Sequence, residues 1–119
     1  MSTLFQAIRS NDLDQVIELL ADKKTNINEI DICGRTSLMV ASFNGYINIV
    51  NLLLEKGANI NIKDKQNRTA LEWSKLPNKQ ANNDNKLKIL KILEKKQLSP
   101  KSTFNKFIDF IKGNPPNKN

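Results

Sequence analysis

Apolar residues recur at helical spacing in the middle of the chain. Ile47, Val50, Leu53 and Leu54 lie at positions i, i+3, i+6 and i+7, which places them on one stripe of a helix. Gly57 follows this stripe and suits a left-handed C-cap, because glycine has no side chain to clash at positive φ. The pattern therefore predicts an amphipathic helix that ends shortly before Gly57.

The same pattern returns along the chain. The segment 31–38 reappears 33 residues later as 64–71, with Asp, Arg, Thr and Leu at matching positions. Gly34 matches Asn67, and Gly45 has a matching asparagine, Asn11, in the first unit. Asparagine tolerates positive φ better than most residues, so these exchanges predict left-handed turns at both places. A fixed period of this length indicates stacked supersecondary units.

Three such units can be aligned along the chain. They cover about residues 2–30, 31–63 and 64–98, and the third contains an insertion at about 77–83. Proline and asparagine in this insertion favour a turn or loop. Within the second and third units, Thr36 and Thr69 precede the first helix, where their hydroxyl groups are placed to cap free N–H groups.

The fullest unit, 31–63, resembles an ankyrin repeat, which consists of a β-turn finger and two antiparallel helices. The resemblance rests on Asp-x-x-Gly-Arg-Thr-x-Leu at 31–38 and extends over about residues 2–98. It implies an all-α solenoid of about three repeats, with inward-facing side chains at Leu38, Val40, Ala41, Ile47, Val50 and Leu53. Ser37 and Met39 replace the usual Pro and His after the capping threonine, so the family's Thr–His hydrogen bond is absent.

The resemblance also implies where a partner would bind, in a concave groove of finger tips and first helices. The family's contact positions fall on Arg9, Ile30, Ile32, Cys33, Arg35, Phe43, Asn44, Lys63, Lys65, Gln66 and Arg68. We expect Phe43 and the isoleucines to form the apolar centre of a protein-binding patch, with basic residues around it. An aromatic anchor beside arginines is a common composition for a binding hot spot.

Each apolar residue of this patch also has a structural interpretation. Ile30 and Ile32 alternate along the finger and would then pack against adjacent fingers. Phe43 would lie beneath the insertion of the third repeat, and Cys33 would be no more than a small apolar residue. Trp73 aligns with a core position, so we expect it to serve packing.

The composition of the chain excludes several classes of function. The 119 residues include no histidine, which removes the commonest general base, and a single cysteine, which excludes an intramolecular disulfide and a cysteine cluster for zinc. We therefore expect no catalysis, no cofactor and no bound metal. The N-terminus lacks a basic region followed by an apolar stretch, and nothing approaches the roughly 20 apolar residues of a membrane span. The expected location is the cytoplasm.

Charge is distributed unevenly. Residues 1–74 carry eight Lys/Arg and nine Asp/Glu, whereas residues 75–119 carry eleven lysines and three acidic residues. The basic half suggests an alternative function, electrostatic binding of a polyanion such as nucleic acid or an anionic membrane. Base readout favours arginine, which this half lacks, so any nucleic-acid binding would be non-specific and sensitive to salt.

The end of the chain contains a further apolar pattern. Phe104, Phe107, Ile108 and Ile111 lie at i, i+3, i+4 and i+7, which predicts an amphipathic helix within 99–113. This helix would cap the last repeat, because the end of a solenoid leaves an apolar face open. The alternatives are insertion into a partner's groove or binding to an anionic membrane. Residues 114–119 are expected to be disordered.

The sequence as a whole predicts a non-catalytic protein–protein interaction module. It would bind a protein partner, with no small-molecule substrate, as an adaptor, an inhibitor or an immunity-type protein. A preformed groove would bind by surface complementarity at little ordering cost.

Overall fold

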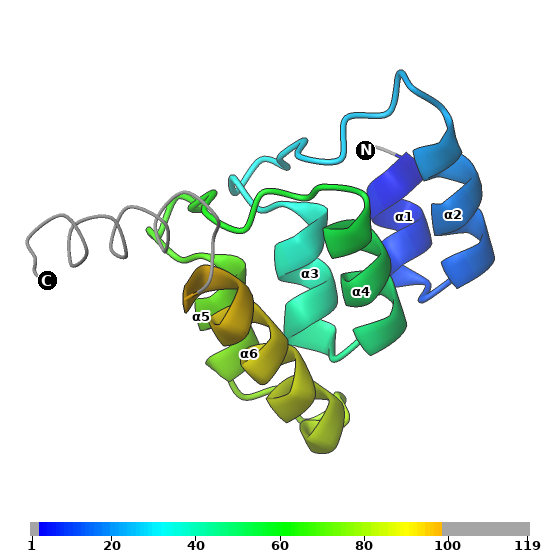
Figure 1. The fold of residues 1–119 in the computed structure, drawn as a ribbon. Helices are drawn as coiled ribbons and strands as arrows, with labels where there is room; N and C mark the ends of the chain where they lie inside the picture. Colours follow the sequence, from blue (N-terminus) through cyan, green and yellow to red (C-terminus); the bar gives the residue numbers. More distant parts are fainter. Residues whose placement is uncertain (1–2, 99–119) are drawn as a thin grey trace, which may run out of the picture.

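The computed structural model describes residues 3–98, and six helices lie within this range (Figure 1). Their bounds are α1 Thr3–Arg9, α2 Leu13–Ala21, α3 Ser37–Asn44, α4 Ile47–Glu55, α5 Ala70–Lys75 and α6 Asn83–Leu98. The described residues contain no strand, which confirms the all-α prediction. The helix expected within 99–113 and the tail 114–119 lie outside the described residues.

The helices form three pairs that stack side by side into a short solenoid. Each pair is a helical hairpin, α1 with α2, α3 with α4 and α5 with α6, and the members of each pair contact one another. Between pairs, α3 contacts both α1 and α5, and α4 contacts both α2 and α6. The segments that join the pairs run along one edge of the stack, where they form the fingers (Figure 1).

The hydrophobic core is formed where neighbouring pairs meet. In α3, every residue from Ser37 to Ser42 is buried, because this helix lies between α1 and α5. In α4 the structure differs from the predicted inward face: Ile49 is fully buried, whereas Ile47 is only half-buried. Since α4 contacts α2 and α6 as well as α3, its buried face is wider than one stripe.

The backbone at the predicted turns has the expected conformation. Gly34 and Asn67 have φ values of +78° and +67°, and Gly45 and Asn11 have φ values of +74° and +54°. Gly57 has a φ of +93° and follows Lys56, the residue after the end of α4. These left-handed residues confirm both Gly/Asn exchanges and the predicted glycine cap.

A threonine stands at the N-cap of α3 and of α5, Thr36 and Thr69. The Oγ1 of Thr36 accepts a hydrogen bond from the backbone N–H of Met39 at 3.3 Å, which confirms the predicted cap of α3. At the start of α5 the backbone N–H of Thr69 donates to Oε1 of Glu72 at 2.9 Å. This reciprocal bond is half of a capping box, and it satisfies an N–H group that the helix itself leaves free.

The linker between α5 and α6 packs against the end of α3. It contains most of the predicted insertion, 77–83, and Asn83 begins α6. The Nδ2 of Asn78 donates to the backbone oxygen of Phe43 at 3.0 Å, which fastens the linker to the second repeat. The fit is close at Gly45, where an added Cβ would lie 3.3 Å from the backbone oxygen of Asn82.

This close approach predicts a difference between two glycines. We expect Gly45→Ala and Gly57→Ala each to lower the free energy of unfolding by about 1–2 kcal/mol, because alanine is strained at positive φ. Gly45→Ala should lose about 1 kcal/mol more, since its Cβ crowds the linker, whereas nothing lies within 4 Å of a Cβ at Gly57. Urea unfolding followed by circular dichroism measures both values. Equal losses would show that the linker moves away from the added Cβ at position 45 at no cost in free energy.

Candidate protein-binding groove

Each finger turn is built around an aspartate. The Oδ1 of Asp31 accepts hydrogen bonds from the backbone N–H groups of the second and fourth residues after it, each at 2.9 Å. Asp64 makes the same two bonds at the same distance in the next finger. The fingers are also joined to each other, because the backbone N–H of Lys65 donates to the oxygen of Cys33 at 3.1 Å. These bonds fix the positions of the side chains on the finger tips.

Asp31 holds two arginines at the groove. The Nε of Arg35 donates to Oδ2 of Asp31 at 2.9 Å, and an Nη2 of Arg9 lies 3.9 Å from the same oxygen. Burial of Asp31 raises the pKa of its carboxyl, but hydrogen bonds from the backbone and side chain of Arg35 outweigh burial. The net effect holds this pKa below its usual value, so Asp31 is ionised at neutral pH.

Trp73 lies on α5, in the third repeat, and contacts residues of both fingers. Its Nε1 donates to Oδ2 of Asp64 at 2.9 Å. The guanidinium carbon of Arg68 lies 4.5 Å from the centre of the Trp73 ring, and that of Arg35 lies at 6.0 Å. Both distances are within the range of cation–π attraction. The indole is therefore oriented by a hydrogen bond and flanked by two cations.

A second aromatic ring extends this arrangement toward the core. The rings of Phe43 and Trp73 meet edge to face, with centroids 5.2 Å apart and an interplanar angle of 77°. The Nζ of Lys86 lies 4.8 Å from the Phe43 centroid and donates to the backbone oxygen of Leu76. Burial lowers the pKa of Lys86. Phe43 is thus held between the groove and the start of α6.

Three cavities meet at Arg35, which lines all of them. The first, of about 360 Å³, is also lined by Arg9, Phe43, Asn44 and Trp73. The second, of about 310 Å³, is also lined by Ile32, Cys33, Lys65, Gln66 and Trp73. The third, of about 390 Å³, is also lined by Phe5, Arg9, Ile30 and Ile32. Shared lining residues make these cavities one groove along the fingers and first helices, which we call the Arg35 groove.

The structure brings most of the residues predicted for binding into the Arg35 groove. Nine of them line its cavities: Arg9, Ile30, Ile32, Cys33, Arg35, Phe43, Asn44, Lys65 and Gln66. Arg68 reaches the groove through its contact with Trp73. Lys63 is exposed and lines none of the three cavities. Ile30 and Ile32 are 58% and 85% exposed, so adjacent fingers do not cover them.

Sequence reasoning missed the role of Trp73. Alignment with a core position predicted packing, and one side of the half-buried ring does pack against the core. Its other side lines two of the three cavities. The signal in the sequence was that Trp73 is the only tryptophan in the chain and exceeds the volume of its counterpart, Val40.

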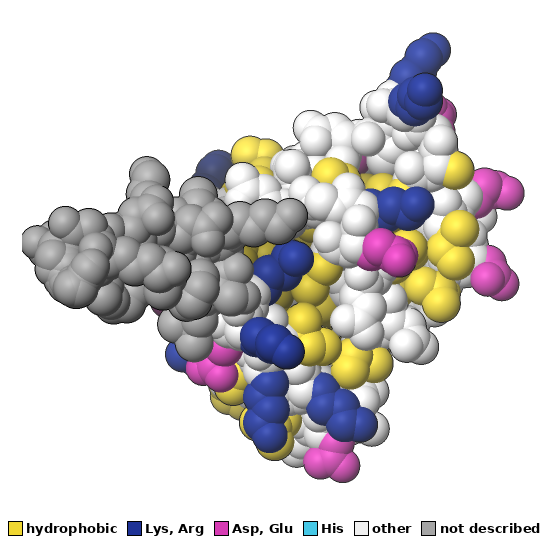
Figure 2. Space-filling model, in the orientation of Figure 1, with side chains coloured by type: hydrophobic (Ala, Val, Ile, Leu, Met, Phe, Trp, Pro, Cys, Tyr) yellow, Lys and Arg dark blue, Asp and Glu magenta, His cyan; other side chains and the backbone are white. Residues whose placement is uncertain are grey.

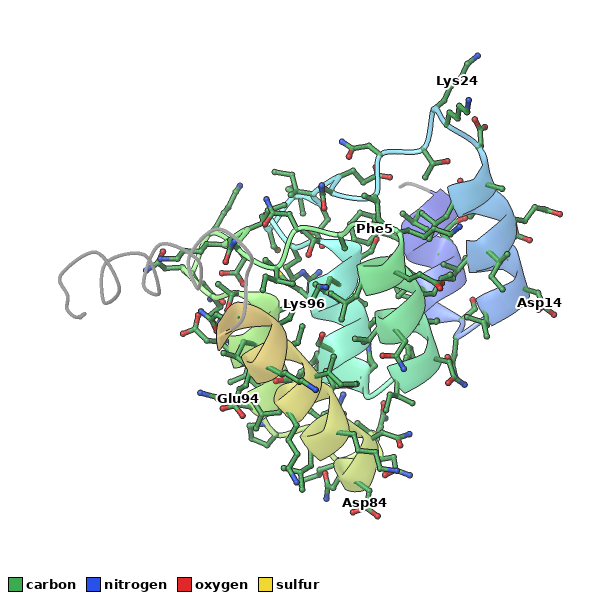
Figure 3. All side chains as sticks on the ribbon, in the orientation of Figure 1. Phe5, Asp14, Lys24, Asp84, Glu94 and Lys96 are labelled. Atoms are coloured by element: carbon green, nitrogen blue, oxygen red, sulfur yellow. The ribbon has the colours of Figure 1, made fainter. Side chains whose placement is uncertain are left out.

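Charged residues outside the groove follow the distribution in the sequence. Figure 2 shows Lys side chains gathered over α6 and Asp and Glu side chains over α2. In Figure 3, Asp14 of α2 and Asp84 of α6 project from the outside of the stack, and Lys24 projects from the linker after α2. Among residues 3–98, no group of three or more His, Cys, Asp or Glu is placed to hold a metal ion. No helix in that range has the length and hydrophobicity needed to cross a bilayer.

Comparison with known proteins identifies the repeats. The family described as ankyrin repeats, in three copies, matches residues 4–103. The region that matches this chain is only a small part of each relative. The serine/threonine-protein kinase VIK of Arabidopsis thaliana is 34% identical over 84 residues, which cover 71% of this chain and 18% of the kinase. The ankyrin repeat domain-containing protein OPG015 of monkeypox virus is 40% identical over 79 residues, or 62% of this chain and 17% of the viral protein.

A solved structure shares the fold. It is the complex of the predatory endopeptidase Bd0816 of Bdellovibrio bacteriovorus with the immunity protein Bd3460. The matching chain superposes with a TM-score of 0.65 and 29% sequence identity, over 80% of this chain and 46% of that chain. This chain therefore spans less than half of the solved chain, and less than a fifth of the two relatives above.

Proposed function

Because the chain belongs to the ankyrin-repeat family, we propose that it is a non-catalytic module that binds a protein partner in the Arg35 groove. One observation carries the proposal. The only tryptophan and all three arginines of the chain converge on this groove, beside two exposed isoleucines. Tryptophan and arginine are the residues most enriched in binding hot spots, and they are surrounded here by side chains able to exclude water.

The matching solved complex supports a protein partner. It contains an endopeptidase and an immunity protein. By analogy, we propose that this chain acts as an adaptor, an inhibitor or an immunity-type protein. The similarity to a plant kinase covers too little of that enzyme to suggest kinase activity here. The alternative, polyanion binding through the lysines of residues 75–119, gains no support from these matches. Cytoplasmic location stays a prediction.

Ile32→Ser tests the groove with little risk to the fold. Ile32 is 85% exposed, so serine should leave the free energy of unfolding nearly unchanged. Burying an isoleucine against a partner contributes about 1.5–3 kcal/mol, so we expect binding to weaken by at least about tenfold. The measurement is quantitative mass spectrometry of proteins retained from the native lysate by wild type and variant at physiological salt.

Ile17→Ser is the matched control. Ile17 lies on α2, away from the Arg35 groove, and is 45% exposed. A protein retained by wild type and by Ile17→Ser, but reduced with Ile32→Ser, supports the proposal and names the partner. If all three proteins retain the same partner equally, the groove is not the binding surface. Retention that occurs only at low salt would favour the polyanion alternative.

A further inference from the structure

A further cavity lies outside the Arg35 groove, between the second helices of the first two repeats. We call it the α2–α4 cavity; its volume is about 340 Å³, and it shares no lining residue with the three cavities of the groove. Its lining residues are Leu13, Ile17, Asn48, Asn51, Leu52 and Glu55. Ile17 is one of four large hydrophobic residues that are exposed within residues 3–98, and the half-buried Leu13 and Leu52 line the same cavity. The α2–α4 cavity therefore exposes apolar surface to solvent.

The two helices around this cavity carry negative charge only. They contain Asp14, Glu18 and Glu55 and no lysine or arginine, in a chain whose net charge is +7. Lys56 lies just beyond α4 and does not line the cavity. Within residues 3–98, none of the three carboxylates forms an ion pair. An incoming cation would thus meet acidic side chains that no internal cation already neutralises (Figure 2).

One segment of the chain has the complementary composition. Residues 101–112, which lie outside the described residues, contain three lysines and one aspartate. Their apolar residues, Phe104, Phe107, Ile108 and Ile111, follow the helical spacing noted above. An amphipathic helix of this kind binds by laying its apolar face in an apolar groove. Its lysines would then lie near the carboxylates of α2 and α4.

The length of the connection favours a second copy over the chain's own segment. Six peptide bonds join Leu98, the end of α6, to Phe104, and they span at most about 20 Å. In the stack α4 lies between α6 and α2 (Figure 1), and two interhelix distances of about 8–10 Å each would use nearly all of that length. No slack would remain for a path around α4. We infer that segment 101–112 of one copy binds the α2–α4 cavity of a second copy.

This contact goes beyond the proposed function and leaves the Arg35 groove open. Because the segment and the cavity are different surfaces, the contact is heterologous, and a dimer keeps one free cavity and one free segment. Further copies can therefore add at either end as the concentration rises. Each copy retains its own Arg35 groove, since the cavity and the groove share no lining residue.

Sedimentation velocity of the full chain at physiological salt tests this inference. We expect association that increases with concentration. Ile17→Ser and Phe107→Ser should each raise the dissociation constant at least about tenfold, the effect of losing one buried large apolar side chain. A mixture of the two variants should form a dimer and nothing larger, because Ile17→Ser contributes the intact segment and Phe107→Ser the intact cavity. Circular dichroism checks that both variants are folded.

A pair of charge reversals tests the acidic surface. Glu55→Lys should weaken association about threefold, and this effect should shrink as salt is added, as expected for exposed ion pairs. Glu94→Lys is the matched control, because Glu94 is an exposed acidic residue of α6 that does not line the cavity. It should associate like wild type. Equal weakening by both reversals would show that only the net charge matters, which would overturn the assigned site.

Other outcomes would also overturn the inference. These are a chain that stays monomeric at every concentration, an Ile17→Ser variant that associates like wild type, and a mixture of variants that forms no dimer. Loss of association with Ile32→Ser would place the segment in the Arg35 groove instead. The proposed function is tested separately: Ile17→Ser should lose self-association and keep the partner of the groove, whereas Ile32→Ser should keep self-association and lose that partner.

Discussion

Ile49→Ala should lower the free energy of unfolding by about 2–5 kcal/mol, the range for truncating a fully buried aliphatic side chain. Ile49 has no exposed surface and lies on α4, which contacts α2, α3 and α6. Truncation leaves a cavity that the surrounding helices cannot close without moving relative to one another. The free energy of unfolding of native domains is about 5–15 kcal/mol, so this loss would be a large fraction of the total stability. Urea unfolding followed by circular dichroism measures it.

Ile47→Ala is the matched control on the same helix. Ile47 is half-buried, so its truncation opens a space that water can enter, and we expect a loss of about 1–2 kcal/mol. The observed packing predicts the larger loss at Ile49. The single stripe predicted from the sequence, which contains Ile47 and not Ile49, predicts the larger loss at Ile47. A loss at Ile47 equal to or larger than that at Ile49 would contradict the packing described above.

Asp64→Asn should lower the free energy of unfolding by about 2–4 kcal/mol, the cost of breaking a buried charged hydrogen-bond set. The side chain of Asp64 is only 2% exposed. Asparagine keeps the oxygen that accepts from two backbone N–H groups, but its amide group then faces the Nε1–H donor of Trp73. Two donors cannot bond, so the indole loses its acceptor. Because Trp73 is the only tryptophan, its fluorescence reports this change during urea unfolding.

Asp31→Asn provides the comparison. Asp31 makes the same backbone bonds in its own finger, but its side chain is 12% exposed and its Oδ2 accepts from Arg35 in place of an indole. We expect a loss of about 1–2 kcal/mol, because water can solvate the displaced guanidinium. A red shift of Trp73 emission should accompany Asp64→Asn and be smaller for Asp31→Asn. Equal losses and equal spectra would show that the bond to Trp73 adds no stability.

Much of the fold is local and was therefore predictable from the sequence. Gly34 and Asn67 adopt positive φ because a tight turn demands it whatever surrounds the turn. Thr36 caps α3 with a bond to a residue only three positions away. The repeat period then places copies of the same unit next to each other. Nine of the eleven residues predicted for binding line the Arg35 groove for this reason, since finger positions follow from register within a repeat.

The amino-acid sequence alone specifies the repeat unit: its helices, caps, turns and the register of its finger residues. Which side chains of that unit are buried, and which reach the groove, depends on packing between the units. Ile49 is buried because α4 contacts helices of both neighbouring repeats, and Trp73 reaches the groove because Asp64, Arg68 and Phe43 converge on it. Lys63 stays outside it although its register suggested otherwise. The burial of Ile49 and the contacts of Trp73 depend on side chains of the adjacent repeat. A repeating sequence pattern specifies the structure of each unit, but it specifies the contacts between units less completely.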